Sequence, residues 1–103
     1  MSGILGLGYA SISVDNLPTF IDTSDLTDKS FAFYLHNNPD LSYMTIPGFE
    51  ETAYNGNMQF HDVAEQKYWS LQFTSMQQSG KDKIDMSRYY AVIDSGTSII
   101  VGP

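Results

Sequence analysis

A carboxylate near the end of the chain has the surroundings of a reactive group. Asp94 ends the apolar run of residues 91–93, and the sequence becomes apolar again at residues 99–101. Apolar strands on both sides would deliver the carboxylate into the interior, where a charge is costly unless it is paired or hydrogen-bonded. Gly96 allows a sharp turn at this point. Three nearby hydroxyl groups could hold the carboxylate, those of Ser95, Thr97 and Ser98.

Other kinds of site explain these residues less well. Asp-Ser-Gly alone often marks a β-turn or the end of a strand, so the tripeptide by itself favours a structural role. A serine-hydrolase nucleophile elbow requires Gly-x-Ser-x-Gly, which the residues around Ser95 do not supply. His36 and His61 have no cysteine or paired carboxylate at metal-site spacing, and the glycines at positions 3, 6 and 8 do not form a dinucleotide-binding fingerprint. We therefore expect no metal and no cofactor.

A hairpin is expected in the first half of the chain. Residues 30–35 alternate in hydrophobicity, which predicts a strand. The turn-forming residues 36–40 follow, and residues 41–46 then give a return strand that ends at Pro47-Gly48.

The elements that must position Asp94 are predicted to be short strands as well. Further strands are expected over residues 58–63, 67–73 and 89–93. The last of these runs into Asp94, and a second apolar strand is expected to lead away from it. A short helix is expected with Pro18 early in it. Strands that follow one another at short spacing without long helices indicate a mainly β fold.

Composition and charge narrow the functions open to the chain. It has 103 residues, no cysteine and a net charge of −7. An acidic chain repels phosphate, which makes nucleic acid and anionic membranes poor partners. No apolar run approaches the ~20 residues that span a bilayer, and the first residues lack the charged start and cleavage site of a signal peptide. We expect no nucleic-acid partner and no membrane span.

The residues around Asp94 are part of a longer pattern. Apolar pairs flank Asp94-Ser95-Gly96-Thr97-Ser98 and a Gly-Pro pair follows, which resembles the second active-site segment of pepsin-like aspartic proteases. Three earlier segments resemble the same family and fall in the family's order. They are Ser2–Tyr9, Ser30–Leu35, and Tyr54–Asn57 followed by Tyr68-Trp69. The resemblance spans essentially the whole chain, and the ordered set of four is more specific than any single segment.

Three places depart from the family's pattern. Ser2 stands where Asp is usual, and Ser95 stands where Thr is commoner, although the hydroxyl is kept. The segment Pro47–Glu50 replaces Gly-Gly-x-Asp, which alters a turn because proline fixes φ and lacks an N–H. None of these changes touches the carboxylate of Asp94.

The resemblance implies a partial pepsin-like bilobal β-barrel fold. Residues 1–29 would form the end of the amino-terminal lobe and residues 30–50 the inter-lobe strand region. Residues 51–103 would form the start of the carboxy-terminal lobe, ending just after the catalytic turn. Missing strands would leave sheet edges open, so we expect marginal stability for the isolated chain.

The resemblance also implies a mechanism and a set of roles. In this family two aspartates share one proton and activate a water that attacks the peptide carbonyl, and Asp94 would be one of them. Ser95 would hydrogen-bond the opposite active-site loop, Gly96 would let that loop approach, and Thr97 would orient the carboxylate. Substrate contacts are expected from Ile4, Tyr68, Val92 and Ser98. Packing in a core explains the first three of these equally well.

The second aspartate is not expected within this chain. The chain has no earlier Asp-Thr/Ser-Gly, and it lacks the tyrosine-bearing hairpin, called the flap, that the family has with that motif. The remainder of a parent enzyme would supply both, and the chain alone would be inactive. The expected partner is a peptide or protein substrate, in a lysosome, in an acidic vesicle or outside the cell. One alternative is a non-catalytic pepsin-like module that binds peptides or proteins. Another is a small acidic β-domain in which the motifs are coincidental.

Overall fold

The computed structural model describes residues 3–102, whose contacts divide the chain into two compact units. The hairpin unit contains the residues up to Leu7 together with Pro18–Gln59, and the Asp94 unit contains Gly8–Leu17 together with the residues from Phe60 onward. Ser2 begins one of the family-like segments and Pro103 ends another, and both lie outside the described residues. The division at residues 29 and 50 stays a prediction.

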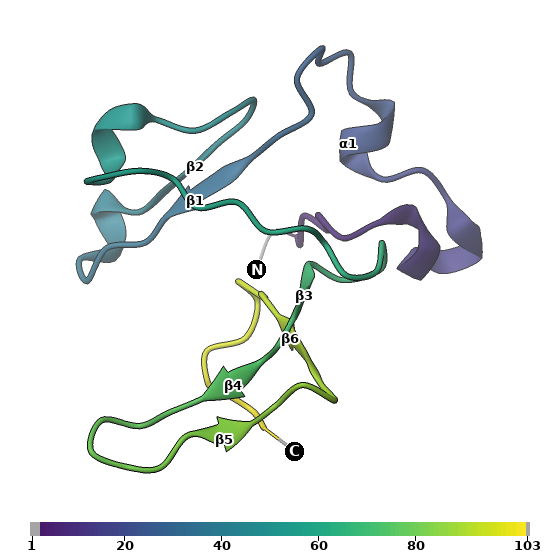
Figure 1. The fold of residues 1–103 in the computed structure, drawn as a ribbon. Helices are drawn as coiled ribbons and strands as arrows, with labels where there is room; N and C mark the ends of the chain where they lie inside the picture. Colours follow the sequence, from purple (N-terminus) through teal and green to yellow (C-terminus); the bar gives the residue numbers. More distant parts are fainter. Residues whose placement is uncertain (1–2, 103) are drawn as a thin grey trace. The chain divides into compact units, whose positions relative to one another are not determined.

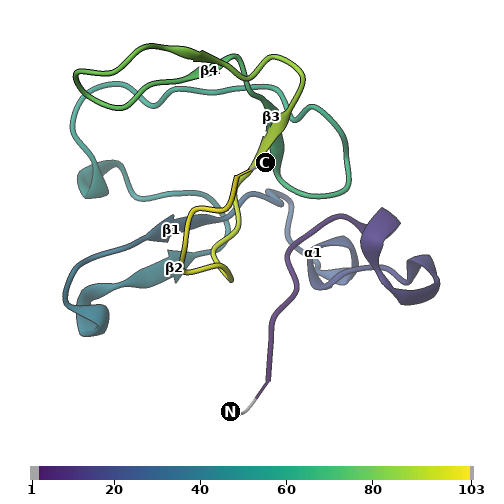
Figure 2. The same ribbon diagram turned by 90° about the horizontal axis from the view of Figure 1, so that it is seen from below.

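The hairpin unit is built on the expected antiparallel pair. Strand β1 (Ala32–Tyr34) pairs with strand β2 (Tyr43–Thr45), and the two lie side by side in both ribbon views (Figure 1, Figure 2). Between them the 3-10 turn η3 (Pro39–Leu41) reverses the chain, and the Asn38 side chain caps it by accepting from the Asp40 N–H. The hairpin predicted from alternation and turn residues is therefore confirmed.

Over residues 3–102 the helical structure is limited to short turns. Helix α1 (Phe20–Thr23) begins after Thr19, whose hydroxyl accepts from the Asp22 N–H while the Asp22 carboxylate accepts from the Thr19 N–H. The expected helix therefore starts beyond Pro18 rather than around it, because Thr19 supplies the cap. The other helical turns are η1 (Ala10–Ile12), η2 (Val14–Asn16) and η4 (Glu51–Ala53).

Two antiparallel ribbons form the Asp94 unit. Strand β3 (Ser70–Gln72) pairs with β6 (Tyr90–Val92), and β4 (Ser75–Met76) pairs with β5 (Ile84–Asp85). Figure 1 shows β4 and β5 side by side, joined by a long turn. The strands expected over residues 67–73 and 89–93 are thus confirmed in shortened form. The β4–β5 ribbon is not predicted from the sequence, because strands of two residues are too short to alternate.

Two expected strands are absent. Neither residues 57–63 nor residues 97–102 form a strand, and Phe60 is 78% exposed and Ile100 97% exposed. An apolar run becomes a strand only where a neighbouring strand takes up its N–H and C=O groups. No ladder pairs either segment within the described residues. The mainly β class is confirmed, but its sheets are smaller than predicted.

Burial contributes little to holding these ribbons. Among residues 3–102, Met86 is the only buried hydrophobic residue, at 7% exposure, and Ser70 is the only buried polar one. The Met86 N–H donates to the Thr74 carbonyl at 3.0 Å, and the Ala64 N–H donates to the Ser70 carbonyl at 2.8 Å. Backbone hydrogen bonds therefore do most of the positioning around Asp94.

Candidate active site

Strand β6 leads directly into Asp94. The Ile93 N–H donates to the Trp69 carbonyl at 2.9 Å, so the pairing of β3 with β6 reaches the residue just before the carboxylate. Trp69 packs against Tyr9, with ring centroids 4.8 Å apart, and the Tyr9 N–H donates to the Lys67 carbonyl at 3.1 Å. Residues distant in sequence thus fix the end of the strand that positions Asp94.

The turn after β6 binds both carboxylate oxygens of Asp94. The Gly96 N–H donates to Oδ1 at 2.9 Å, and the Thr97 hydroxyl donates to Oδ2 at 2.5 Å. The Thr97 N–H donates to the Asp94 carbonyl at 3.2 Å and closes the turn. Such Asx turns form because a short acidic side chain can accept from the backbone two residues onward. Two local donors therefore fix the orientation of this carboxylate.

Glycine at position 96 leaves room for this arrangement. A β carbon there would lie 3.1 Å from Asp94 Oδ1. That separation is shorter than ordinary van der Waals contact, so a larger residue would displace either the carboxylate or the peptide that binds it. The reason for Gly96 is therefore close approach.

The two donors favour the ionised carboxylate. The Thr97 hydroxyl, followed by the Gly96 N–H, holds the pKa of Asp94 below its usual value of 3.8, while desolvation opposes them. A carboxyl group whose pKa is lowered on folding stabilises the folded chain above its unfolded pKa. That contribution is lost as the pH falls through the lower, folded pKa. At the pH of the unfolded pKa, folding therefore shifts Asp94 toward its ionised form.

The expectation of a buried carboxylate is wrong for this chain. Asp94 is exposed, and the apolar residues before it, Val92 and Ile93, are 50% and 64% exposed. Strand β6 pairs only with β3 in the described residues, and residues 98–102 form no strand. The two strands expected to enclose the carboxylate therefore do not both form.

The other predicted site residues fall in both units. Ser95 and Ser98 are exposed beside Asp94. Val92 lies two positions before Asp94, on the same side of an extended chain. Tyr68 is 55% exposed and precedes Trp69, whose carbonyl accepts from the Ile93 N–H. Ile4 is 88% exposed and belongs to the hairpin unit. The Asp94 unit thus contains every predicted site residue except Ile4.

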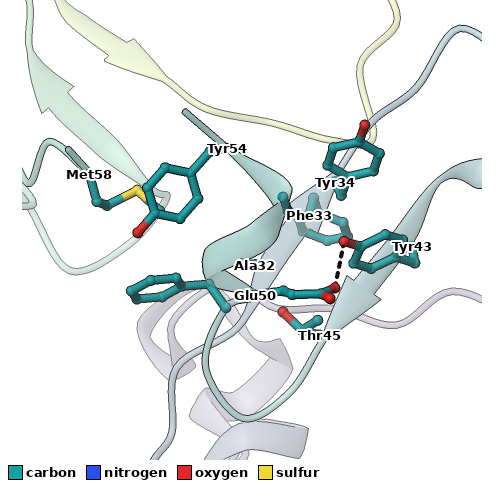
Figure 3. A pocket seen from close by; sticks show the side chains of 10 residues that line it. Ala32, Phe33, Tyr34, Tyr43, Thr45, Glu50, Tyr54 and Met58 are labelled. Atoms are coloured by element: carbon teal, nitrogen blue, oxygen red, sulfur yellow. Dashed lines mark hydrogen bonds between the residues drawn. The ribbon is translucent and has the colours of Figure 1, made fainter. Parts of the chain in front are cut away.

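The hairpin unit contains a small aromatic pocket that the sequence pattern does not predict. Its volume is about 120 Å³, and β1, β2 and the residues after them line it (Figure 3). Tyr34 and Tyr43, opposite each other in the hairpin, stack with ring centroids 5.1 Å apart. Aromatic residues at facing positions of a predicted hairpin are the signal that could have located this pocket.

Glu50 is the one charged residue in the lining of this pocket. Its Oε2 accepts from the Tyr43 hydroxyl at 2.8 Å (Figure 3), and its Oε1 accepts from the Thr52 hydroxyl at 2.9 Å. Both bonds lower the pKa of Glu50, and the Tyr43 bond has the larger effect. The bond between Tyr43 and Glu50 also raises the pKa of Tyr43. The Tyr43 bond joins β2 to the segment that follows it, and the Thr52 bond lies within that segment.

The structure shows no metal cluster or spanning helix in the part of the chain that it describes. No three His, Asp or Glu residues among positions 3–102 gather closely enough to hold a metal ion. None of the helices over the same range is long and apolar enough to cross a membrane. The groups that contact the Asp94 carboxylate are a hydroxyl and a backbone amide. Both donate hydrogen bonds, which favour the ionised form of the carboxylate.

Comparison with known families covers the whole chain. A family model for eukaryotic aspartyl proteases matches residues 1–103. The chain belongs to this family. Membership confirms the resemblance seen in the ordered segments, and it identifies the short strands as part of a pepsin-like, mainly β fold.

Three relatives illustrate how much of the family's length is present. Cathepsin D of Bos taurus is 34% identical over 108 aligned residues, which cover 98% of this chain and 28% of the relative. Embryonic pepsinogen of Gallus gallus is 33% identical over 105 residues, with 98% and 27% covered. Cathepsin E-A of Xenopus laevis is 32% identical over 108 residues, again with 98% and 27% covered. The chain therefore spans little more than a quarter of the length of these relatives.

Proposed function

We propose that this chain supplies one of the two catalytic aspartates of an aspartic endopeptidase, and that Asp94 is that residue. The observation that carries the proposal is the turn in which Gly96 and Thr97 each bind one oxygen of the Asp94 carboxylate. Family membership supports the reaction class, which is hydrolysis of a peptide bond in a peptide or protein substrate. The proposal needs no cofactor.

The proposed mechanism uses two carboxylates that share one proton. Like charges so close cannot both ionise easily, so the pair titrates as a unit. The ionised member takes a proton from water as the water oxygen attacks the peptide carbonyl carbon, and the protonated member donates to the carbonyl oxygen. Breakdown of the tetrahedral intermediate then transfers a proton to the leaving amine. The remainder of the parent enzyme would supply the second aspartate and the flap.

Each neighbour of Asp94 has a proposed role. Thr97 and Gly96 orient the carboxylate and keep it ionised through the two bonds described above. The exposed Ser95 hydroxyl would bond the loop that carries the second aspartate. Proposed substrate contacts are Tyr68, Val92 and Ser98 from the Asp94 unit and Ile4 from the hairpin unit.

A tetrahedral peptide analogue separates an enzyme from a module that only binds peptides. An enzyme binds a peptide whose scissile amide is replaced by a secondary alcohol more tightly than it binds the matching substrate, because the alcohol mimics the reacting geometry. We expect the full-length protein to prefer the analogue by ~10²-fold or more. Asp94→Asn should remove the preference, whereas Asp85→Asn, a change at another exposed aspartate of the same unit, should keep it. Equal binding of both peptides by the unaltered protein would support the non-catalytic module.

The compartment follows from the same proposal. A dyad that shares one proton works in acid, so a lysosome, an acidic vesicle or an acidic extracellular space suits it. Fractionation of cells that express the full-length protein would test this. Recovery in a neutral compartment alone would contradict it.

A further inference from the structure

The turn at residues 54–57 joins η4 to the unpaired segment 57–63. Asn55 is exposed, and Gly56 has φ of +86°, the left-handed region that glycine adopts without strain. Apart from the two neighbouring residues, no heavy atom of residues 3–102 would lie within 4 Å of a β carbon at position 56. The Asn-Gly pair is therefore unobstructed on its glycine side.

Neither residue of this pair is tied down within residues 3–102. The Asn55 carboxamide and the Gly56 N–H make no hydrogen bond there. Asn38 is the contrast, because its side-chain oxygen accepts from the Asp40 N–H and the next residue, Pro39, has no N–H. Asn55 thus combines a free side chain with a following amide nitrogen that no side chain shields.

We propose that Asn55 is a site of hydrolytic deamidation through a cyclic imide. The Gly56 nitrogen attacks Cγ of Asn55, so an N–Cγ bond forms and the Cγ–Nδ2 bond breaks. Ammonia leaves with the proton that the backbone amide gives up. Water then adds to one of the two imide carbonyls, and the ring opens to aspartate or to isoaspartate. The net reaction consumes one water and releases one ammonia.

The modification would act on the edge of the aromatic pocket. Tyr54, the first residue of the turn, and Met58, the residue just after it, both line that pocket (Figure 3). The product adds a carboxylate to a chain whose net charge is already −7. Isoaspartate also adds a methylene group to the backbone between the two lining residues. The backbone between Tyr54 and Met58 would therefore lengthen, and the segment that follows Glu50 would gain a negative charge.

The test uses the full chain in a mildly alkaline buffer made with water enriched in the heavy oxygen isotope. Mass spectrometry should show that Asn55 converts to isoaspartate and aspartate and takes up the label, with isoaspartate in excess. Asn57 is the internal control, because it is exposed in the same turn but precedes the bulky Met58. Asn57 should remain an amide while most of Asn55 converts.

Two variants complete the test. Asn55→Gln keeps an amide and Gly56 but needs a larger ring, so conversion should be lost. Gly56→Ala should slow conversion, although alanine is strained at this φ. Three results would each overturn the proposal. Asn57 could convert as fast as Asn55, or aspartate could form without isoaspartate. The third is that Asn55 stays intact in the chain while it converts in a free peptide of residues 50–62.

Discussion

Two aspartate turns, one in each unit, begin with the same bond and then differ. The Ser30 N–H donates to Asp28 Oδ1 at 2.9 Å, just as the Gly96 N–H donates to Asp94 Oδ1 at 2.9 Å. At Asp28 the second donor, the Ser30 hydroxyl, reaches the same oxygen at 2.7 Å. At Asp94 the second donor, the Thr97 hydroxyl, reaches the other oxygen. Both arrangements lower the pKa of the carboxyl group.

The second donor also decides what else each turn is joined to. The Ser30 hydroxyl accepts from the Gly48 N–H at 3.0 Å, and the Ser30 carbonyl accepts from the same group at 3.1 Å. The Asp28 turn is therefore cross-linked to the end of the hairpin. The Thr97 hydroxyl makes no further bond in the described part of the chain. One turn ties the fold together, while the other only holds a carboxylate in place.

Among changes to the residues that hold Asp94 in place, Gly96→Ala is expected to have the largest effect. The new β carbon would lie 3.1 Å from Asp94 Oδ1 and push the carboxylate away from its position. A displacement of this kind should lower kcat/KM of the full-length enzyme by up to about a hundredfold. Gly102→Ala is the matched control, because in the described part of the chain no heavy atom beyond the neighbouring residue lies within 4 Å of a β carbon there. Equal kcat/KM for the two variants would show that close approach at residue 96 is unimportant.

A smaller effect is expected when the second donor is removed. Thr97→Ala leaves Asp94 Oδ2 without its hydroxyl partner, which should cost roughly tenfold in kcat/KM and raise the pKa of the Asp94 carboxyl group. Thr97→Ser keeps the hydroxyl and should stay close to the unaltered enzyme. Carbon-detected NMR titration of the Asp94 carboxyl group follows the pKa directly. An unchanged pKa in Thr97→Ala would contradict the assigned cause.

The local parts of this contrast are the parts that the sequence predicts. The hairpin and the Asp94 turn depend on residues close in the chain, and both form. The strand expected over residues 58–63 and the strand expected to lead away from Asp94 do not form. A strand needs a partner elsewhere in the chain, and its own residues do not specify that partner. For the same reason the predicted burial of Asp94 fails. Side-chain packing, as in the pocket around Tyr34 and Tyr43, lies beyond what periodicity can indicate.

The Asp28 turn should respond to mutation in stability and not in catalysis. Ser30→Ala removes the hydroxyl that joins Asp28 to Gly48, which should lower the free energy of unfolding by about 0.5–1.5 kcal/mol. The kcat/KM of the full-length enzyme should not change. Ser79→Ala is the control, since Ser79 makes no side-chain hydrogen bond among residues 3–102. A loss of activity in Ser30→Ala without loss of stability would show that the Asp28 turn acts in catalysis and not in folding.

Acid should weaken both turns together, and this is the smallest effect expected. Folding lowers the pKa of Asp28 and of Asp94, so each stabilises the folded chain above its unfolded pKa near 3.9. Each contribution is lost as the pH falls through the folded pKa. Denaturant unfolding of the full-length protein should therefore show stability that falls below this pH, and Asp28→Asn with Asp94→Asn should reduce that dependence. The lowered pKa values of Asp22, Glu50 and Asp85 should preserve the rest of it. A dependence that is unchanged in the double variant would contradict these shifts.

The most direct test of the central claim compares Asp94→Asn with Asp28→Asn in the full-length enzyme. Both variants keep the size of the side chain and both remove a carboxylate that accepts from the backbone two residues onward. If Asp94 is catalytic, kcat/KM for cleavage of an unfolded protein in acid should fall at least ~10²–10⁴-fold in Asp94→Asn and stay near the original in Asp28→Asn. Retained activity in Asp94→Asn, or an equal loss in both variants, would contradict a catalytic role for Asp94.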